Sequence, residues 1–510
     1  MKVPLTVSDF IDRAATVYGR RLGLVDEPDQ PGTPLPDLTY QEVHQRATAL
    51  AKCLDELGIG FSERVAIVTK NSARMLISFF GVSGYGRILV PINFRLQPTE
   101  IRYILEHSGA SLLLVDPELK SSLSDIPGLP QIVLDEVGDK QLFGDTRPPQ
   151  SWTGSEDATA TINYTSGTTA QPKGVQLTHR NVWLNATLLG LHTRVTDRDV
   201  YLHTLPMFHC NGWGMPFILS AMGVPQIVLR QIDGHEILKR IEQHGVTLLC
   251  GSPTVLNMIV HAAEDWDGPI PGTGSVRMVV AGAAPPRKLI EQVEDLLGWE
   301  FIQIYGLTET SPLLTVNHLR EELDQLSTPD RADSLSRAGY PALGIRLRVD
   351  TTNEVCAQGN VVMDGYWNNT DASSDALRDG WFHTGDGGTI NTDGALQLHD
   401  RQKDVIISGG ENISSIEVED ILFAHPEVLE VAVIGVPDEK WGETVKALVV
   451  VAPNAGLDEE TLITYCRDRL AHFKCPTSVE FRESLPRTAT GKLQKFRLRA
   501  PYWENQEGLP

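Results

Sequence analysis

The sequence predicts an α/β protein with a large N-terminal domain of helix-flanked sheets, a β-rich subdomain and a small α+β C-terminal domain. Short β-branched runs alternate with helical patterns over much of the chain, which is typical of sheets covered by helices. A stretch rich in Gly, Asp, Asn and Trp follows at about residues 350–400, and a compact set of helices and strands closes the chain. The length of 510 residues fits one large and one small domain, or about three ordinary ones.

The alternation of strands and helices is clearest near the N-terminus. The expected elements are a buried strand at 63–69 (ERVAIVT), a helix at 72–86, the strand ILVPIN, a helix at 98–109 and a strand at 110–116. The same order of strand, turn and helix returns at 245–264 and 276–298. We therefore expect α/β units with parallel strands in these regions.

The last part of the chain has a different character. The segments GNVVMDGYWNNT, LRDGWFHTGDGG and NTDGALQLHDRQKD predict β-hairpins and exposed loops. Beyond them we expect the helix IEVEDILFAHP, the strands VLEVAVIGVPD and TVKALVVVA, the helix DEETLITYCRDRLAHF and the strand SVEFRE. These elements can form a core of their own. We therefore predict one domain at 1–400 and a second at 401–510.

The composition is that of a globular protein with an ample core. Hydrophobic residues make up 41% of the chain and charged residues 22%. The net charge of -22 argues against nucleic acid or an anionic membrane as a main partner. It does not argue against a nucleotide, because a local glycine and lysine site can bind phosphate inside an acidic protein.

Targeting signals and disulfides are not expected. The N-terminus lacks the apolar segment of a signal peptide, no run approaches a membrane span, and the final NQEGLP contains no peroxisomal tripeptide. We therefore expect a cytoplasmic protein without stable membrane insertion. The six cysteines are scattered without a CxxC pair, which favours reduced thiols over a zinc site.

The stretch YTSGTTAQPKGV at 164–175 has the composition of a phosphate-binding loop, since small hydroxyl and glycine residues lead into a lysine. Compared with the P-loop pattern G-x-x-x-x-G-K-[ST], it fails at two positions. Pro172 replaces the second glycine, and Gly174 replaces the hydroxyl residue that binds Mg²⁺. Because proline fixes φ and has no N–H to aim at phosphate, we exclude a kinase-like or P-loop phosphotransferase. Taken alone, the stretch could still be a polar surface loop.

Three further motifs complete a pattern. They are IQIYGLTETSP (302–312), WFHTGD (381–386) with DRQKD (400–404), and LPRTATGKLQK (485–495). In this combination and order the chain resembles the acyl-adenylate-forming superfamily, which includes acyl-CoA synthetases, 4-coumarate-CoA ligases, luciferases and peptide-synthetase adenylation domains. The resemblance covers essentially the whole chain. It implies an AMP-forming acyl-CoA ligase with a mobile small domain, acting on ATP, coenzyme A and a carboxylic acid with Mg²⁺.

The resemblance assigns the nucleotide site residue by residue. Lys492 would neutralise the charge that develops when a carboxylate attacks the α-phosphate. Thr308 would hydrogen-bond that phosphate, and Glu309 is a hard oxygen ligand suited to Mg²⁺. Tyr305 would stack on adenine, and Asp386 would accept both ribose hydroxyls. The other expected contacts are Thr165, Ser166, Gly167, Thr168, Thr169 and Lys173 around the β- and γ-phosphates, Gly282, Ala283, Ala284 and Gly306 near adenine, and Arg401 at the ribose or phosphate.

Each of these residues has an ordinary structural alternative. Tyr305 could serve core packing, Glu309 could be a solvated loop carboxylate, and Lys492 could be a surface lysine. The presence of all the motifs at family spacing argues against these alternatives. The joint presence of Lys173, Glu309 and Lys492 also argues against a non-catalytic nucleotide- or acyl-binding protein that retains the fold.

The acceptor side is expected in the small domain. The resemblance places a hinge at Lys403 and brings SGGENISS to the pantetheine channel, where Gly409 and Gly410 permit close backbone approach. PDEKWGE resembles the surface that meets CoA, with Trp441 as a contact; an exposed turn with a buried Trp441 is the alternative. Transfer to an acyl-carrier protein and a luciferase-like oxidation are rival second steps.

The acid is expected to lie against LPMFHCNGWGMP at 205–216. His209 would be a gate or a neighbour of the carboxylate, with a satisfied core histidine as the alternative. Trp213 and Met215 are candidate walls. The string HCNGW is most similar to plant acyl-activating enzymes and bacterial methylmercaptopropionate-CoA ligases, which favour small to medium acids. We predict a short- or medium-chain fatty acid, with an aryl or methylthio-propionate acid as the alternative, and leave the oligomeric state, a homodimer included, open.

Two departures from the family pattern stand out. Ala170 occupies a position in the phosphate loop that is usually glycine. The hairpin before EVCAQGN, at about 348–358, is shorter than in relatives. Since the motifs on both sides are intact, we interpret this second departure as a trimmed surface loop.

Overall fold

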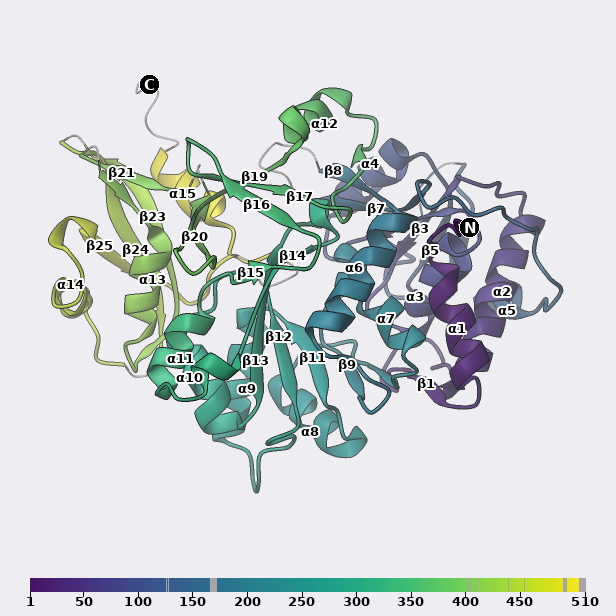
Figure 1. Ribbon diagram of the computed structural model, residues 1–510, viewed down its shortest axis with the longest axis horizontal. Helices are drawn as coiled ribbons and strands as arrows, with labels where there is room; N and C mark the ends of the chain where they lie inside the picture. Colours follow the sequence, from purple (N-terminus) through teal and green to yellow (C-terminus); the bar gives the residue numbers. More distant parts are fainter. Residues whose placement is uncertain are drawn as a thin grey trace.

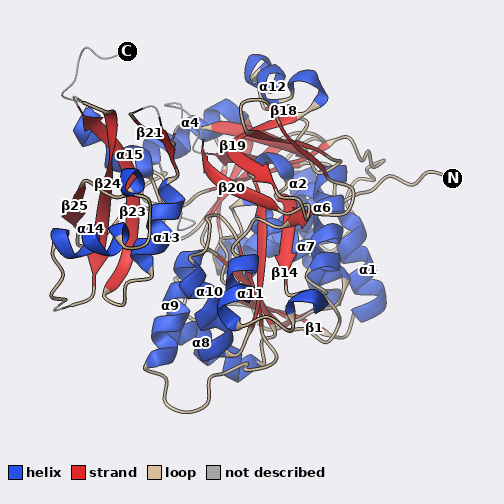
Figure 2. Cartoon of the chain, turned by 60° about the vertical axis from the view of Figure 1, so that its left-hand side comes forward, coloured by secondary structure: helices blue, strands red, loops and turns tan. Residues whose placement is uncertain are grey.

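The computed structural model consists of a large N-terminal part and a smaller C-terminal part, which lies at the left in Figure 1. It describes residues 1–124, 126, 128–165, 172–401, 404–409, 411–438, 440–453, 455–488 and 493–503, without the side chains of residues 400, 401 and 412. In the large part, strands gather inside and helices cover them (Figure 2). Within the described ranges, no helix is both long enough and apolar enough to cross a membrane.

A seven-stranded sheet forms one half of the large part, in the order β18-β8-β7-β4-β3-β5-β6. Its central strands β4, β3 and β5 pair in parallel, which confirms the prediction from the alternating pattern. β8 pairs antiparallel with β7 and with the edge strand β18. The strands are β3 (Arg64–Val68), β4 (Ile88–Ile92), β5 (Ala110–Val115), β6 (Gln131–Val133), β7 (Thr159–Thr165), β8 (Lys173–Thr178) and β18 (Gly365–Tyr366). The neighbouring helices in sequence are α3 (Ala73–Ser78), which continues as a π-helix at Phe79–Ser83, α4 (Pro98–Ser108) and α5 (Glu136–Phe143).

A nine-stranded sheet forms the other half, in the order β15-β14-β13-β12-β11-β9-β10-β1-β2. The strands from β13 to β1 pair in parallel, and antiparallel strands close both edges. The strands are β1 (Leu22–Val25), β2 (Leu38–Thr39), β9 (Tyr201–His203), β10 (Gln226–Val228), β11 (Leu248–Gly251), β12 (Arg277–Val280), β13 (Glu300–Gly306), β14 (Leu313–His318) and β15 (Tyr340–Pro341). The helices of this region and of the N-terminus are α1 (Ser8–Tyr18), α2 (Tyr40–Glu56), α6 (His179–His192), α7 (Met215–Ala221), α8 (Gly234–His244), α9 (Pro253–Glu264), α10 (Arg287–Gln292) and α11 (Thr328–Leu335).

One apolar core joins the two sheets. It contains buried side chains from β3, β7 and β8 of the first sheet and from β11, β12 and β13 of the second. Phe217 of α7 lies within it, with its ring centroid 5.4 Å from that of Phe79 and 5.8 Å from that of Phe80. Because protein cores are close-packed, this shared core keeps motifs carried by β8 and β13 in a fixed relation.

The Gly- and Asp-rich stretch forms a four-stranded antiparallel sheet, in the order β16-β17-β19-β20. The short connection at 350–353 closes the hairpin between β16 and β17. Asp350 Oδ1 accepts hydrogen bonds there from the N–H groups of Thr352 (2.8 Å) and Glu354 (2.9 Å). The trimmed hairpin is therefore a satisfied turn. The elements are β16 (Arg346–Val349), β17 (Glu354–Gln358), α12 (Thr370–Ala376), β19 (Phe382–Ile390) and β20 (Leu396–Arg401).

The small part has its own core, as the sequence predicts. A five-stranded sheet carries α13 and α14 against one apolar cluster, while Leu498 of α15 belongs to a second cluster. The second expected helix ends at Arg467 rather than near Phe473, and beyond it the N–H of Arg469 bonds to the carbonyl oxygen three residues back, that of Cys466 (3.0 Å), which tightens the last turn. The elements are β21 (Ile406–Ser408), β22 (Glu411–Ile413), α13 (Ser415–Phe423), β23 (Val428–Asp438), β24 (Gly442–Val451), α14 (Glu459–Arg467), β25 (Ser478–Phe481) and α15 (Lys495–Trp503). The division at residues 400/401 stays a prediction.

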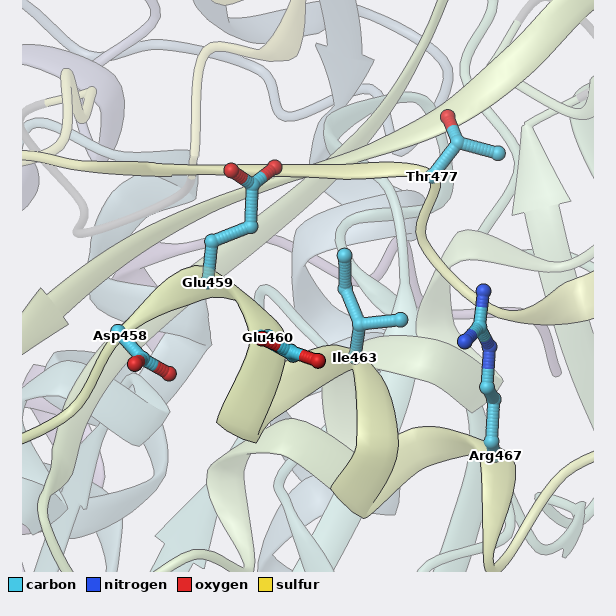
Figure 3. A pocket seen from close by; sticks show the side chains of 6 residues that line it. All are labelled: Asp458, Glu459, Glu460, Ile463, Arg467 and Thr477. Atoms are coloured by element: carbon cyan, nitrogen blue, oxygen red, sulfur yellow. The ribbon is translucent and has the colours of Figure 1, made fainter.

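A hollow on the small part lies beside α14 (Figure 3). Two of its acidic side chains have structural partners. Asp458 Oδ1 accepts the N–H of Thr461 (2.8 Å) and caps α14, and Glu459 Oε1 accepts the N–H of Val479 (2.9 Å). The hollow therefore reflects the packing of α14 against β25, far in sequence from the phosphate and nucleotide motifs. Its lining residues are Asp458, Glu459, Glu460, Ile463, Arg467 and Thr477.

α13 also connects the small part to the large one. Asp420 of α13 accepts a hydrogen bond from the N–H of Arg287 (3.0 Å) and lies 3.3 Å from Arg287 Nε. Burial raises the pKa of the Asp420 carboxyl above its usual range. Phe423 packs against the apolar clusters of both parts. Since Arg287 begins α10, directly after the AGAAPP segment, the two parts meet next to a predicted element of the nucleotide site.

Candidate active site

The suspected phosphate loop joins two antiparallel strands. β7 ends at Thr165 and β8 begins at Lys173, and these two residues face each other in the register. A P-loop instead joins a strand to a helix, so the topology supports the exclusion of a P-loop. The predicted contacts Ser166, Gly167, Thr168 and Thr169, and the unusual Ala170, lie outside the described residues.

Close packing explains the glycine at position 174. It lies opposite Tyr164 in the hairpin, and a Cβ there would lie 3.0 Å from the Tyr164 ring and 2.8 Å from Ile162 Cγ2. The Tyr164 hydroxyl lies 2.8 Å from Nδ1 of His107, which anchors the ring. The base of the hairpin therefore has no room for the hydroxyl side chain that a P-loop carries at this position.

Thr308 and Glu309 lie on a 3-10 turn, Thr308–Thr310, just after β13. The chain reverses so sharply that a Cβ at Gly306 would lie 1.5 Å from Pro312 O, which explains the glycine. Thr310 closes the turn by donating a hydrogen bond to Pro312 O (2.6 Å). Thr308 and Glu309 are thus held at the carboxyl end of a strand, where open α/β sheets bind their ligands.

Two predicted nucleotide contacts are joined directly. The hydroxyl of Tyr305 donates a hydrogen bond to Asp386 Oδ2 over 2.8 Å. Tyr305 is the penultimate residue of β13 in the nine-stranded sheet, whereas Asp386 lies on β19 of the antiparallel sheet and is 9% exposed. Asp386 also faces Arg401 in the β19–β20 register, although the Arg401 side chain lies outside the described residues. The structure therefore brings the adenine and ribose candidates together at a junction of two sheets.

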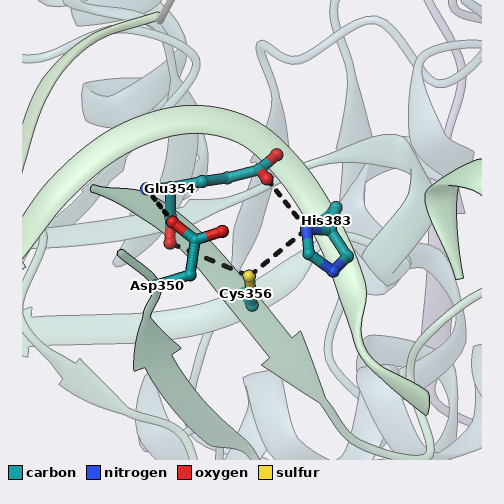
Figure 4. A group of neighbouring side chains, drawn as sticks. All are labelled: Asp350, Glu354, Cys356 and His383. Carbon is teal, nitrogen blue, oxygen red and sulfur yellow. Dashed lines mark hydrogen bonds and ion pairs between the residues drawn. The ribbon is translucent and has the colours of Figure 1, made fainter. Parts of the chain in front are cut away.

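Glu354 supports the segment that carries Asp386, a role that the sequence did not reveal, and Figure 4 shows its contact with His383. Its Oε1 accepts the N–H of Gly385 (2.8 Å), and its Oε2 accepts from Nδ1 of His383 (2.8 Å) and from Arg378 (3.0 Å). Because a carboxylate only accepts hydrogen bonds, Nδ1 carries the proton. Both residues stand in motifs of the sequence, Glu354 in EVCAQG and His383 in WFHTGD, but the sequence does not show that they pair across the sheet.

The same corner holds a group of side chains of the types that bind metal ions. Ligand atoms of Asp350, Glu354, Cys356 and His383 all lie within 4.8 Å of one another. Burial raises the pKa of the Cys356 thiol, which disfavours the thiolate that a metal needs. The Arg378 guanidinium already neutralises Glu354. We interpret this group as a hydrogen-bonded support of the Asp386 segment.

The predicted acyl-pocket segment contains a left-handed turn. Cys210, Asn211 and Trp213 have φ values of 47°, 52° and 59°, and the glycines between and after them are also positive. Such residues are strained and persist only where the surroundings hold them. Trp213 is 4% exposed and Met215 is fully buried. His209 lies half-buried at the start of the turn.

Buried amides hold this turn. Asn211 accepts a hydrogen bond from Asn163 Nδ2 (3.0 Å) and donates one to Thr161 Oγ1 (2.9 Å). Asn185 Nδ2 donates to the carbonyl oxygen of Trp213 (3.0 Å). Since Thr161 and Asn163 lie on β7, the first strand of the β7–β8 hairpin, the predicted acyl segment and the predicted phosphate loop share one support.

The candidate CoA contacts lie on the small part. Gly409 has a φ of 58°, and its N–H donates to Trp441 O (2.9 Å). A Cβ at Gly409 would lie 2.8 Å from the Trp441 ring, so the glycine allows the indole to pack on the backbone. Trp441 is 48% exposed, which shows that the alternative of a buried Trp441 was wrong. Gly410 lies outside the described residues.

The remaining candidates divide into two groups. The backbone of Gly282, Ala283 and Ala284 follows β12 and is exposed, with a φ of 93° at Gly282. Lys492 and the predicted hinge residue Lys403 lie outside the described residues. The structure therefore places only Gly282, Ala283 and Ala284, which lie between β12 and α10.

Comparison with known proteins agrees with this geometry. The AMP-binding enzyme family matches residues 11–367, and its C-terminal domain matches residues 417–492. The chain is 37% identical to a 2-methylpropanoate–CoA ligase of Humulus lupulus, over 97% of this chain and 95% of that protein. It is 34% identical to the peroxisomal trans-cinnamate:CoA ligase of Petunia hybrida, over 98% and 94% of the two chains. A crystal structure of an anthranilate CoA ligase with anthranoyl-AMP superposes with a TM-score of 0.88 at 26% identity, covering 98% of this chain and 99% of the other.

Proposed function

The chain belongs to the AMP-binding enzyme family and is an ATP-dependent, AMP-forming CoA ligase, and from this premise we propose that it activates a short- or medium-chain fatty acid at the site described above. The observation that supports activation at this site is the hydrogen bond between Tyr305 and Asp386 (2.8 Å). It sets one ring for stacking on adenine and one carboxylate for the ribose, on elements that also present Thr308 and Glu309. A nucleoside bound there would have its phosphates near the 3-10 turn.

The first step forms a mixed anhydride. An oxygen of the substrate carboxylate bonds to the α-phosphorus of ATP, and the bond from that phosphorus to pyrophosphate breaks. The chain contributes positioning and charge neutralisation. Asp386 and Tyr305 hold the nucleoside, Thr308 hydrogen-bonds the α-phosphate and Lys173 neutralises the departing pyrophosphate. Lys492 is assigned to the charge that develops at the α-phosphate.

Glu309 fits the proposed Mg²⁺ ion by its chemistry. Mg²⁺ is usually held by one or two carboxylates together with substrate phosphates, and Glu309 offers one half-buried carboxylate at the end of β13. When bound, the ion would supply charge neutralisation to the phosphates. No second acidic ligand is required of the chain.

The second step forms the thioester. The CoA thiol releases its proton to solvent, its sulfur bonds to the acyl carbon, and the bond from that carbon to the phosphate oxygen breaks so that AMP leaves. Gly409 and Gly410 are assigned to the pantetheine passage and Trp441 to the CoA surface. An exposed indole beside a glycine backbone, with Lys440 Nζ 4.4 Å from the ring centroid, is a suitable surface for an anionic nucleotide.

The proposed limit on the chain length of the acid rests on the position of Trp213. The left-handed turn holds this indole in the core, in the apolar cluster that also contains Met207, Phe208 and Met215. A rigid indole in such a place limits the length of an acyl chain. The relatives point to both small branched acids and aryl acids, since one is named for 2-methylpropanoate and another for trans-cinnamate. We therefore keep an aryl acid or a methylthio-propionate as the alternative.

An acid panel tests the function. Purified protein with ATP and Mg²⁺ is given straight-chain acids from about C2 to C16, 2-methylpropanoate and trans-cinnamate, and pyrophosphate, AMP and acyl-CoA are measured. We expect pyrophosphate with short and medium chains, and acyl-CoA only when CoA is added. Failure to release pyrophosphate with any of the acids would overturn the proposed adenylation, and exclusive use of aryl acids would overturn the fatty-acid proposal.

The acceptor is tested in the same assay. Pyrophosphate without thioester would contradict transfer to free CoA. Thioester formed only on an added phosphopantetheinylated acyl-carrier protein would favour the carrier-loading alternative. The protein's cytoplasmic location stays a prediction, and the peroxisomal name of one relative makes fractionation of cells the direct check.

A further inference from the structure

Tyr366 contacts two charged residues of the proposed site, Glu309 and Lys173, and the proposed function gives it no role. It ends the edge strand β18, which pairs with β8 so that Tyr366 faces Val175. The N–H of Met363, just before this strand, donates to the carbonyl oxygen of Glu309 (2.8 Å). The segment is thus tied by its backbone both to the phosphate hairpin and to the turn that carries Glu309.

The side chain of Tyr366 makes the same two connections. Its hydroxyl donates a hydrogen bond to Glu309 Oε1 over 2.9 Å. The ammonium of Lys173 lies 4.9 Å from the centroid of its ring. Lys173 begins β8 and Glu309 follows β13, so one aromatic side chain bridges charged groups from the two sheets of the large part.

The chemistry of each contact is suited to positioning. The Tyr366 hydroxyl is a hydrogen-bond donor, and the Glu309 carboxylate can only accept, so the 2.9 Å contact fixes the direction of this bond. Carboxylates that bind metal ions are commonly held by such a hydrogen bond, and loss of the partner typically weakens metal binding about 10- to 100-fold. The ring face attracts the Lys173 ammonium and limits the directions that this long side chain can take.

We propose that Tyr366 is a positioning residue of the nucleotide site, which orients Glu309 toward Mg²⁺ and Lys173 toward the β- and γ-phosphates. The proposal rests on the function given above, because it assigns Glu309 to Mg²⁺ and Lys173 to phosphate. It adds that the hydroxyl and the ring have separable tasks. The hydroxyl acts on the metal ligand, and the ring acts on the cation.

Tyr366→Phe separates these tasks, because it removes the hydroxyl and keeps the ring and its packing. Tyr366→Leu removes both. Tyr340→Phe is the matched control, since the Tyr340 hydroxyl also donates to a carboxylate, that of Asp393 (3.2 Å), but outside the proposed site. The measured quantity is the dissociation constant of ATP by calorimetry, without any acid substrate, in Mg²⁺ and in EDTA.

We expect Mg²⁺ to tighten ATP binding to the wild type and to Tyr340→Phe equally. In Tyr366→Phe this gain should fall about 10-fold or more, while ATP binding in EDTA stays at the wild-type value. In Tyr366→Leu, binding in EDTA should also weaken about 2- to 5-fold, from the lost ring contact to Lys173. A purely structural role would lower thermal stability and leave the Mg²⁺ gain intact.

If Mg²⁺ tightened ATP binding to Tyr366→Phe as much as to the wild type, the positioning role would be overturned, even if the enzyme is otherwise active. Unchanged EDTA binding in Tyr366→Leu would overturn the part concerning Lys173. Failure of the proposed function is distinguishable, because it would appear in the wild-type protein as no pyrophosphate with any acid. In that case the variants would not be needed to reject the proposal.

Discussion

Replacing Asn211 tests the left-handed turn that carries Trp213. Asn211 is 2% exposed and makes two buried hydrogen bonds, at 3.0 Å to Asn163 and 2.9 Å to Thr161. Asn211→Ala leaves the Asn163 amide without this acceptor in the core, which costs about 1–3 kcal/mol. The φ of 52° adds about 1 kcal/mol, since Asn tolerates the left-handed region better than Ala. We expect the free energy of unfolding to fall by about 2–4 kcal/mol.

Asn211→Gly is the matched variant, because it loses the same hydrogen bonds but adopts a positive φ without a steric penalty. In right-handed helical backbone, alanine is more stable than glycine by roughly 0.5–1 kcal/mol. At φ 52° the left-handed penalty of about 1–2 kcal/mol on alanine outweighs that difference. The glycine variant should therefore be the more stable of the two by up to about 1 kcal/mol.

The assay is urea unfolding of both variants in one buffer, with the midpoint and slope of the transition compared with the wild type. The acid panel is run on the same proteins, and we expect longer acids to gain relative to short ones, because the support of Trp213 is loosened. An alanine variant more stable than the glycine variant would refute the backbone reasoning. Wild-type stability in both would refute the assigned hydrogen bonds, and an unchanged acid profile would refute the link to Trp213.

Three other predictions concern the site and the contact between the two parts. Lys492→Ala should abolish adenylation but affect thioester formation from supplied acyl-AMP much less; equal loss of both half-reactions would contradict its role. Tyr305→Phe should weaken AMP binding about 10-fold by calorimetry, because it loses the hydrogen bond to the buried Asp386 carboxylate while keeping the ring; unchanged affinity would show that this bond does not organise the site. Asp420→Ala should loosen the small part and raise the radius of gyration in X-ray scattering, while Glu417→Ala on the same helix, whose partner Lys474 lies within the small part, should not. An equal change in both variants would rule out a specific contact of Asp420 with Arg287.

Local elements were predictable because their signals are local. The strands at 64–68 and 110–115 and the helix at 98–108 occur where apolar runs, Pro98 and Gly109 predict them. Gly109 ends its helix with a φ of 63°, a conformation that favours glycine. The end of α14 was not predictable, because the apolar pattern continues past Arg467. Beyond that end Leu470 packs against the core of the small part, a contact that spacing along the chain does not reveal.

The residue types of the site could also be predicted from local sequence motifs, whereas the partners of these residues could not. The sequence by itself determined the α/β class, the failure of the P-loop pattern at Pro172 and Gly174, and the set of nucleotide motifs. Only the tertiary structure decided that Tyr305 donates to Asp386, that Glu354 holds Gly385, and that Tyr366 bridges Glu309 and Lys173. These contacts join residues from different sheets or strands, and a hydrogen bond depends on distance in space. Spacing along the chain determines that distance within one helix, strand or turn, and packing determines it everywhere else.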